Sequence, residues 1–178
     1  MTTSLIKMTE AIFTEYCQSA IPSYAKENID AGRWKEAGAI ERSREDHDRL
    51  LPEGIKTKNN HLFEIKENNN DQIVGHLWIA IDEQLNQKSA FIYDIEIYEM
   101  FRRKGLAKSV LRNAEEFVME AGIYSIGLHV FSHNKEAKAL YSGLDYKTVD
   151  ENTVDNNIID KKIVSYNMQK QLYPSHSL

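Results

Sequence analysis

The segment Phe101-Arg-Arg-Lys-Gly-Leu-Ala107 stands between a predicted strand, residues 90–98, and the most regular predicted helix of the chain, residues 106–121. A helix N-terminus carries amides without intrahelical partners, and a glycine such as Gly105 lets a ligand approach the backbone. Basic side chains surround this turn, and residues 101–114 contain no Asp or Glu; they are Arg102, Arg103, Lys104, Lys108 and Arg112. These features indicate a site for a pyrophosphate, with a solvated basic helix start as the alternative.

Two common phosphate-binding loops do not fit this segment. A P-loop that ended in Lys108-Ser109 would need glycines where the chain has Arg102 and Ala107. The three-glycine spacing of the Rossmann fingerprint is also missing. The segment therefore predicts a phosphate site of another kind.

The rest of the chain predicts the element order αα, β-hairpin, β, α, β, α, ββ. The first helix begins at the N-cap Thr9, kinks or restarts at Pro22 and ends at Gly32, and the second covers residues 34–51. Strands are predicted at 61–66, 72–81, 90–98 and 125–131, then a short helix capped by Asn134, then strands at 146–149 and 158–168 on either side of Asp155-Asn-Asn157. The β-α-β unit should be parallel and the hairpins antiparallel, in a mixed sheet with helices on its faces.

Two further patterns could carry chemistry. Asp94 and Glu96 alternate on the strand 90–98, so they share one face if the strand is regular, whereas a bulge would break that parity. After the strand 125–131 comes Asn134-Lys-Glu-Ala-Lys-Ala-Leu-Tyr141. A tyrosine at the end of such a helix has a polar hydroxyl that needs a partner, and the alternative is a boundary tyrosine that covers the core.

Together, Arg102-x-x-Gly105-x-Ala107, the acidic strand 90–98 and the motif 134–141 resemble the GNAT superfamily of acetyl-CoA-dependent N-acetyltransferases, in particular its small bacterial members. The resemblance implies a mixed α/β (α+β) fold with a central mixed, mostly antiparallel sheet of six to seven strands and helices on both faces. One N-acetyltransferase domain, 1–178, is expected. Its parts are a helical substrate-side region (1–54), an acetyl-CoA-binding core (61–146) and C-terminal strands (147–170).

The resemblance also implies roles for individual residues. The basic segment would hold the pyrophosphate of coenzyme A, and the residues concerned are Arg102, Arg103, Lys104, Gly105, Leu106, Ala107 and Lys108. The strand end Ile95-Glu96-Ile97 would separate from its neighbour, bind the pantetheine arm and polarise the thioester carbonyl through a backbone N–H near Ile97. Asn134 would contact the cofactor or fix the helix that does, and Tyr141 would lie near the sulfur.

The chain departs from the family's pattern at three positions. Arg103 stands where the motif often has glycine, Glu99 where proline is common, and Asp145 where glycine usually precedes the aromatic residue, here Tyr146. Because Arg103 keeps its backbone amide, phosphate binding is expected to survive. Glu99 and Asp145 would alter only local turns.

Acetyl transfer explains these residue types. An alkyl amine is mostly protonated at neutral pH, so a carboxylate must accept a proton, and the choice between Asp94 and Glu96 stays open. Tyr141 is the expected general acid. The predicted reaction moves an acetyl group from acetyl-CoA to a primary amine of a small molecule by direct attack, without a metal. The alternatives are a protein or peptide N-acetyltransferase and a non-catalytic CoA-binding sensor.

Composition limits the other classes of function. The chain has 22 basic and 27 acidic residues and a formal net charge of −5, which argues against a nucleic-acid-binding protein. One cysteine, no secretory signal and no membrane-spanning run predict a cytoplasmic protein without membrane contact. The oligomeric state stays open, and a homodimer could form if an exposed last strand pairs with a second chain.

Other polar residues have plainer explanations. His129 and His133 fall on a strand and the loop after it, where a four-residue spacing does not bring two rings onto a metal. His76 and Trp78 either line the acceptor groove or mark the polar face of the strand 72–81, and the second interpretation is favoured. Four acidic residues form a solvated helix face or attract a cationic amine; they are Glu41, Glu45, Asp46 and Asp48.

Overall fold

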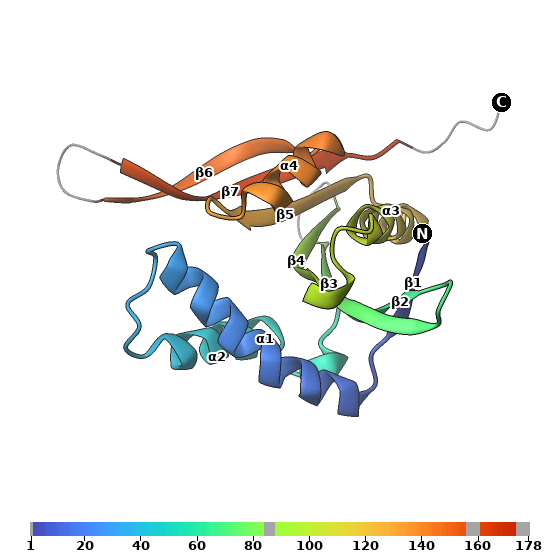
Figure 1. Ribbon diagram of the computed structural model, residues 1–178, viewed down its shortest axis with the longest axis horizontal. Helices are drawn as coiled ribbons and strands as arrows, with labels where there is room; N and C mark the ends of the chain where they lie inside the picture. Colours follow the sequence, from blue (N-terminus) through green and yellow to red (C-terminus); the bar gives the residue numbers. More distant parts are fainter. Residues whose placement is uncertain (1, 84–87, 156–160, 174–178) are drawn as a thin grey trace. The chain divides into compact units, whose positions relative to one another are not determined.

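The structure is a computed structural model that describes residues 2–83, 88–155 and 161–173 (Figure 1). The chain divides into two compact units. The first comprises Met1–Met8, Asn59–Leu128 and Gln169–Leu178, and the second comprises Thr9–Lys58 and His129–Met168. Of the predicted connection 155–157, residues 156 and 157 lie outside the described residues.

The elements follow the predicted order, with one strand added at the start. They are β1 (Thr3–Lys7), α1 (Glu10–Asp30), α2 (Ala39–Leu50), η1 (Gly54–Lys56), β2 (Asn60–Glu67), β3 (Gln72–Asp82), β4 (Ser89–Ile97), η2 (Glu99–Phe101), α3 (Leu106–Glu120), β5 (Ser125–Phe131), α4 (Lys135–Gly143), β6 (Lys147–Asp155) and β7 (Lys161–Gln171). The sequence missed β1 because five residues give too little periodicity to identify a strand. No helix among these described residues is long and apolar enough to cross a membrane.

The strands form one seven-stranded, mostly antiparallel sheet in the order β1-β2-β3-β4-β5-β7-β6, which confirms the predicted fold class. The pairs from β1 to β4 are antiparallel, and β4 and β5 are parallel, as their helix crossover predicts. The last strand, β7, lies between β5 and β6. The expectation that the last strand is exposed for a second chain is therefore wrong, because the sheet ends at β1 and β6.

The second unit confirms one helix start and corrects another. The side chain of Thr9 caps α1 by accepting a hydrogen bond from the Ile12 amide at 3.3 Å. α1 then runs as one helix through Pro22, so the helix does not restart there. α2 begins at Ala39 and not at residue 34, because its N-cap Gly38 has a left-handed φ of 72° that a helix cannot include.

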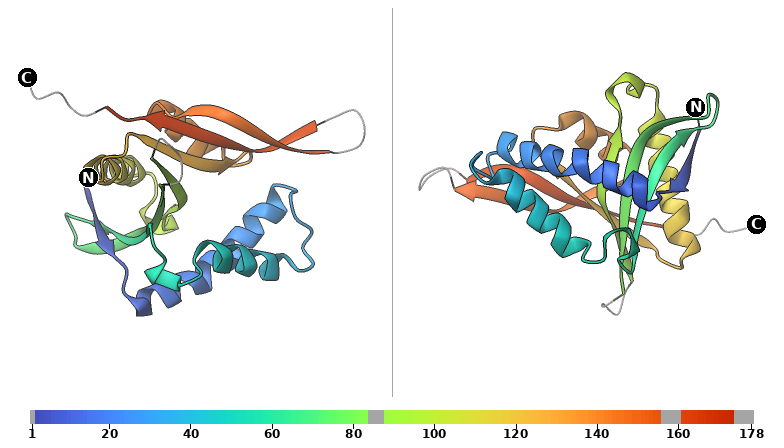
Figure 2. Two further views of the ribbon diagram at one scale, coloured as in Figure 1. Left: turned by 180° about the vertical axis from the view of Figure 1, so that it is seen from behind. Right: turned by 90° about the horizontal axis from the view of Figure 1, so that it is seen from below.

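Cross-strand register gives β2, β3 and β4 two different faces, and these strands lie side by side in Figure 2. On one face the register aligns Phe63, Leu77 and Ile95, and the Phe63 ring lies 5.3 Å from Phe117 of α3. This apolar face packs under α3. On the opposite face the register aligns Glu64, His76 and Glu96, with Trp78 beside Asp94.

A β-bulge decides which face carries the acidic residues of β4. The register passes from Trp78 with Asp94 to Ile79 with Ile92, so Tyr93 is one extra residue. Without it, Asp94 would share the face of Ile92, which is the face under α3. The register is regular from Asp94 to Ile97, so the two carboxylates share the face opposite α3.

Gly75 allows β3 and β4 to approach closely at the end of β4. A Cβ atom at Gly75 would lie 1.9 Å from the backbone oxygen of Glu96. Any side chain at position 75 therefore forces the two strands apart at Glu96.

We expect Gly75→Ala to lower the free energy of unfolding by about 1–3 kcal/mol, the usual cost of overpacking. Gly143→Ala is the matched control, because a Cβ there meets nothing within 4 Å and alanine favours the helix α4. Urea denaturation of both variants measures the difference. Equal stabilities of the two variants would contradict the close approach.

Candidate functional site

β4 and β5 pair over only a short length. Their parallel ladder joins Ala90 with Ile126 and ends at Ile92 with Leu128, although β4 continues to Ile97. Beyond Ile92, β4 remains paired with β3 on its other side. Because backbone N–H and C=O groups need partners, this open edge of β4, at residues 95–97, suits an extended ligand that binds as an added strand.

The backbone groups of Ile95 and Ile97 point to the open edge. The Tyr98 amide donates to the Val74 oxygen at 2.9 Å, and the Glu96 oxygen faces the Cα of Gly75. Residues 96 and 98 thus face β3. Since alternate residues of an antiparallel strand turn their backbone groups to opposite edges, residues 95 and 97 face the open side. These are the groups that the resemblance assigns to the pantetheine arm.

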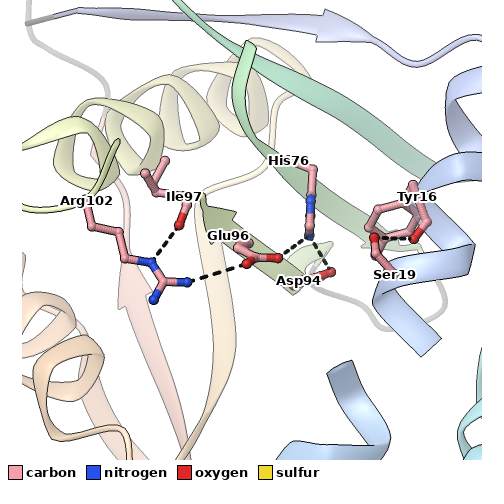
Figure 3. A network of polar contacts seen from close by, with 7 residues as sticks. All are labelled: Tyr16, Ser19, His76, Asp94, Glu96, Ile97 and Arg102. Carbon is pink, nitrogen blue, oxygen red and sulfur yellow. Dashed lines mark hydrogen bonds and ion pairs between the residues drawn. The ribbon is translucent and has the colours of Figure 1, made fainter. Parts of the chain in front are cut away.

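Arg102 lies at the end of this open edge. Its Nε donates to the Ile97 carbonyl oxygen at 2.8 Å, and its Nη2 lies 3.5 Å from Glu96 Oε1 (Figure 3). The second contact is weak, because both side chains are exposed and water screens their charges. The Arg102 side chain therefore fixes the end of β4 by binding the Ile97 carbonyl oxygen. The Ile97 amide faces the open edge.

The basic segment turns into α3 as the sequence predicts. Gly105 is the N-cap with φ 76°, no side chain caps the helix, and its first turn contains no acidic residue. A Cβ at Gly105 would meet no described residue within 4 Å, so this glycine is needed for its backbone angle and not for space. Arg103 also has a positive φ, 66°. The loop and the open edge of β4 belong to the same unit, and the loop can bind an anion through the first amides of α3.

His76 brings the two carboxylates of β4 together. Its Nε2 lies 3.0 Å from Asp94 Oδ2 and 3.6 Å from Glu96 Oε2 (Figure 3). The ring is buried, whereas the carboxylates are about one-third exposed. Burial lowers the pKa of His76, but the hydrogen bond and charge of Asp94 and the charge of Glu96 outweigh burial and raise the pKa above 6.5.

Sequence reasoning gave His76 two possible roles, lining the acceptor groove or marking the polar face of the strand, and it favoured the second. The signal that could have found its contacts is the matching alternation of His76 and Trp78 on one strand and Asp94 and Glu96 on the next. Trp78 also makes specific contacts. Its indole N–H donates to Asn60 Oδ1 at 2.7 Å, and its ring stacks on that of Tyr93 with 4.8 Å between the ring centroids.

Asn134 and Tyr141 lie in the second unit, on α4. Asn134 Oδ1 accepts a hydrogen bond from the Ala137 amide at 3.1 Å, so this side chain fixes the start of α4. Tyr141 is buried, with its ring 6.0 Å from that of Tyr146. Their proposed places beside the cofactor stay predictions.

A comparison with protein families matches residues 22–146 to the acetyltransferase (GNAT) family. The chain is 37% identical over 146 residues to YdgE of Bacillus subtilis, across 82% of this chain and 92% of that protein. It is 39% identical over 141 residues to YycN of the same organism, across 79% of this chain and 90% of that protein. Both relatives are described as uncharacterised N-acetyltransferases.

Solved structures give the same fold. The crystal structure of Bacillus subtilis YycN superposes with a TM-score of 0.83 at 34% identity, covering 89% of this chain and 100% of that one. The PaiA N-acetyltransferase of Thermoplasma acidophilum, solved with coenzyme A, has a TM-score of 0.66 at 18% identity, covering 96% and 99%. Spermidine N-acetyltransferase of Vibrio cholerae, solved with CoA and spermine, has a TM-score of 0.64 at 15% identity, covering 96% and 95%.

The contacts of His76 make the stability of the fold depend on pH. The folded-state pKa of His76 lies above the ordinary 6.5. Protonated His76 therefore stabilises the fold fully below pH 6.5, and this stabilisation is lost as the pH rises through the folded-state pKa. We therefore expect His76→Gln to lose more stability at about pH 5.5 than at about pH 8.5 in urea denaturation.

His61→Gln is the matched control, on the α3 face of the same sheet. Burial, and then the charge of Lys7, lower the pKa of His61, so the folded chain resists protonation at this ring. His61→Gln should therefore lose less stability at about pH 5.5 than at about pH 8.5. A loss in His76→Gln that does not depend on pH would contradict the contacts described above.

Proposed function

Because the chain belongs to the GNAT family of acetyltransferases and is an N-acetyltransferase, we propose that it acetylates a primary amine of a small molecule by direct attack on acetyl-CoA, without a metal. The observation that carries this proposal is the open edge of β4 in the same unit as the uncapped N-terminus of α3. The first suits an extended amide-containing arm, and the second suits a pyrophosphate. The single cysteine supports a reducing, cytoplasmic setting.

The chain offers matching partners for each part of coenzyme A. The backbone groups of Ile95 and the amide of Ile97 would bind the pantetheine arm, and the amides from Arg103 to Ala107 would bind the pyrophosphate. When bound, acetyl-CoA supplies the acetyl group as an activated thioester. The Ile97 amide is the backbone donor that would polarise the thioester carbonyl, as an oxyanion hole does.

Side chains would carry the protons of the reaction. A carboxylate on the face opposite α3, Asp94 or Glu96, would take the proton of the amine directly or through water. Tyr141 would give a proton to the leaving thiolate, and Asn134 would keep α4 in place for this step.

A small cationic amine is the proposed acceptor. The partly exposed carboxylates of β4 favour a cation. In the second unit, the acidic residues of α2 are a separate feature that would also attract a cation. The structural neighbour from Vibrio cholerae acts on spermidine, which makes spermidine a suitable first probe. A screen that compares free amines with peptides as acceptors, with release of the coenzyme A thiol as the measured signal, tests this preference. Turnover of peptides alone would contradict it.

Lys108→Glu tests the pyrophosphate site. A carboxylate in the first turn of α3 favours the helix but repels the phosphates, so we expect about tenfold weaker coenzyme A binding with thermal stability kept or raised. Calorimetric titration with coenzyme A measures the affinity. Arg112→Glu, one turn further from the helix start, is the matched control and should have a smaller effect. If Lys108→Glu binds coenzyme A with wild-type affinity, the pyrophosphate does not bind at the N-terminus of α3.

Tyr141→Phe tests the general acid. We expect kcat with spermidine to fall about 100-fold or more, while the KM for acetyl-CoA changes little. Tyr146→Phe is the matched control, because its ring is adjacent and the proposal gives it no proton to transfer. An unchanged kcat of Tyr141→Phe over the full pH profile would show that the acid is another group.

A further inference from the structure

His76 lies beneath the two carboxylates of β4 and contacts both. The side chain of His76 is 5% exposed, against 32% for Asp94 and 39% for Glu96. A substrate from solvent would therefore meet a carboxylate before it met the ring. The contacts of His76 allow it to act on the reaction through Asp94 or Glu96.

The two carboxylates receive unequal contacts from their neighbours. Asp94 Oδ2 is at hydrogen-bond distance from His76 Nε2, 3.0 Å. Within the described part of the chain, Glu96 has only long contacts, 3.6 Å to His76 Nε2 and 3.5 Å to Arg102 Nη2. Asp94 is thus engaged by the ring, whereas Glu96 keeps its lone pairs for a substrate or a water molecule.

His76 favours the charged form of the two neighbouring carboxylates, Asp94 and Glu96. Without a cation or donor between them, two neighbouring carboxylates tend to share one proton, and a shared proton blocks the base. The other titratable or charged groups that face His76 do not replace it. Glu64 on β2 is a further anion, and the Tyr98 ring lies 6.1 Å away. The exposed Arg102 side chain lies 3.5 Å from Glu96 and donates to the Ile97 carbonyl oxygen.

We propose that His76 is a positioning residue for acetyl transfer: its hydrogen bond holds Asp94 apart, so that Glu96 is the carboxylate that takes the proton of the amine. This inference rests on the function proposed above and decides between the two candidate bases. In each turnover the amine nitrogen bonds to the acetyl carbon and the carbon–sulfur bond breaks. The sulfur takes a proton from Tyr141, which is reprotonated from solvent, and Glu96 takes the proton of the nitrogen and releases it to solvent.

Kinetics with spermidine and acetyl-CoA test the assignment. Glu96→Gln should lower kcat about 100-fold or more, as expected for loss of a general base. Asp94→Asn and His76→Leu should each lower kcat about tenfold, the size of one hydrogen bond to a charged group. The double variant of Asp94 and His76 should be no slower than either single variant, because the two residues act as one unit.

Two further readouts separate positioning from a structural role. His76→Gln keeps a donor to Asp94 and should recover most of the kcat that His76→Leu loses, with the KM for acetyl-CoA unchanged in both variants. The acid limb of the pH–rate profile should move to higher pH in His76→Leu. His61→Leu, on the α3 face of the same sheet, is the matched control for loss of a histidine, and its kcat should stay close to that of the wild type.

An NMR titration of the His76 ring tests the contacts without catalysis. Asp94→Asn should lower the pKa of His76 more than Glu96→Gln does, because Asp94 provides both a hydrogen bond and a charge. This measurement holds even if His76→Leu does not fold or spermidine is not a substrate. Absence of turnover with any amine would count against the proposed function, whereas the titration would still decide the pairing of His76.

Three results would overturn the inference. The first is wild-type kcat in both His76→Leu and His76→Gln. The second is losses in Asp94→Asn and His76→Leu that multiply in the double variant, because independent residues behave in that way. The third is a pKa of His76 that responds more to Glu96→Gln than to Asp94→Asn.

Discussion

The single extra residue of the bulge at Tyr93 decides where the acidic side chains of β4 lie. Residues two apart share a face of a strand, so a regular β4 would align Asp94 and Glu96 with Ile92 under α3. Buried there, two carboxylates would lose their hydration without gaining partners, at a cost that a marginally stable fold cannot offset. The bulge turns them to the opposite face, beside His76.

The bulge also decides which backbone groups of β4 face β3 and which face the open edge. Beyond the bulge, Glu96 and Tyr98 turn their backbone groups toward β3, and the close approach at Gly75 keeps the strands together there. Ile95 and Ile97 consequently present theirs to the edge where the ladder with β5 has ended. The side-chain chemistry on one face and the backbone recognition at one edge therefore have a common origin in the register of β3 and β4.

The sequence predicted most elements well because their signals are local. Periodicity identified α3 and the strands β2 to β5, and a local capping pattern at Asn134 identified α4. The start of α2 was placed five residues too early because Trp34 and Ala37 continue an apolar pattern, whereas the left-handed Gly38 decides where the helix begins. The edge position of the last strand was wrong because strand order depends on long-range pairing that no local pattern contains. The division into one domain stays a prediction.

The candidate site was predicted unevenly for a related reason. The apolar positions 90, 92, 95 and 97 change phase after Ile92, which is a visible sign of the bulge, yet the pairing of His76 with Asp94 follows only from the register of two strands.

The departures from the family pattern show what such a pattern encodes. Arg103 and Asp145 stand where the family pattern predicts glycine, and both have positive φ angles, 66° and 68°. The chain thus keeps the backbone conformation and accepts roughly 1–2 kcal/mol of strain at each residue, with less at aspartate, which tolerates this region better than most residues. At Arg103 the strain coincides with an added cation in the loop proposed to hold a pyrophosphate. At these two positions the motif glycine therefore marks a required backbone angle, which an arginine or an aspartate can also adopt.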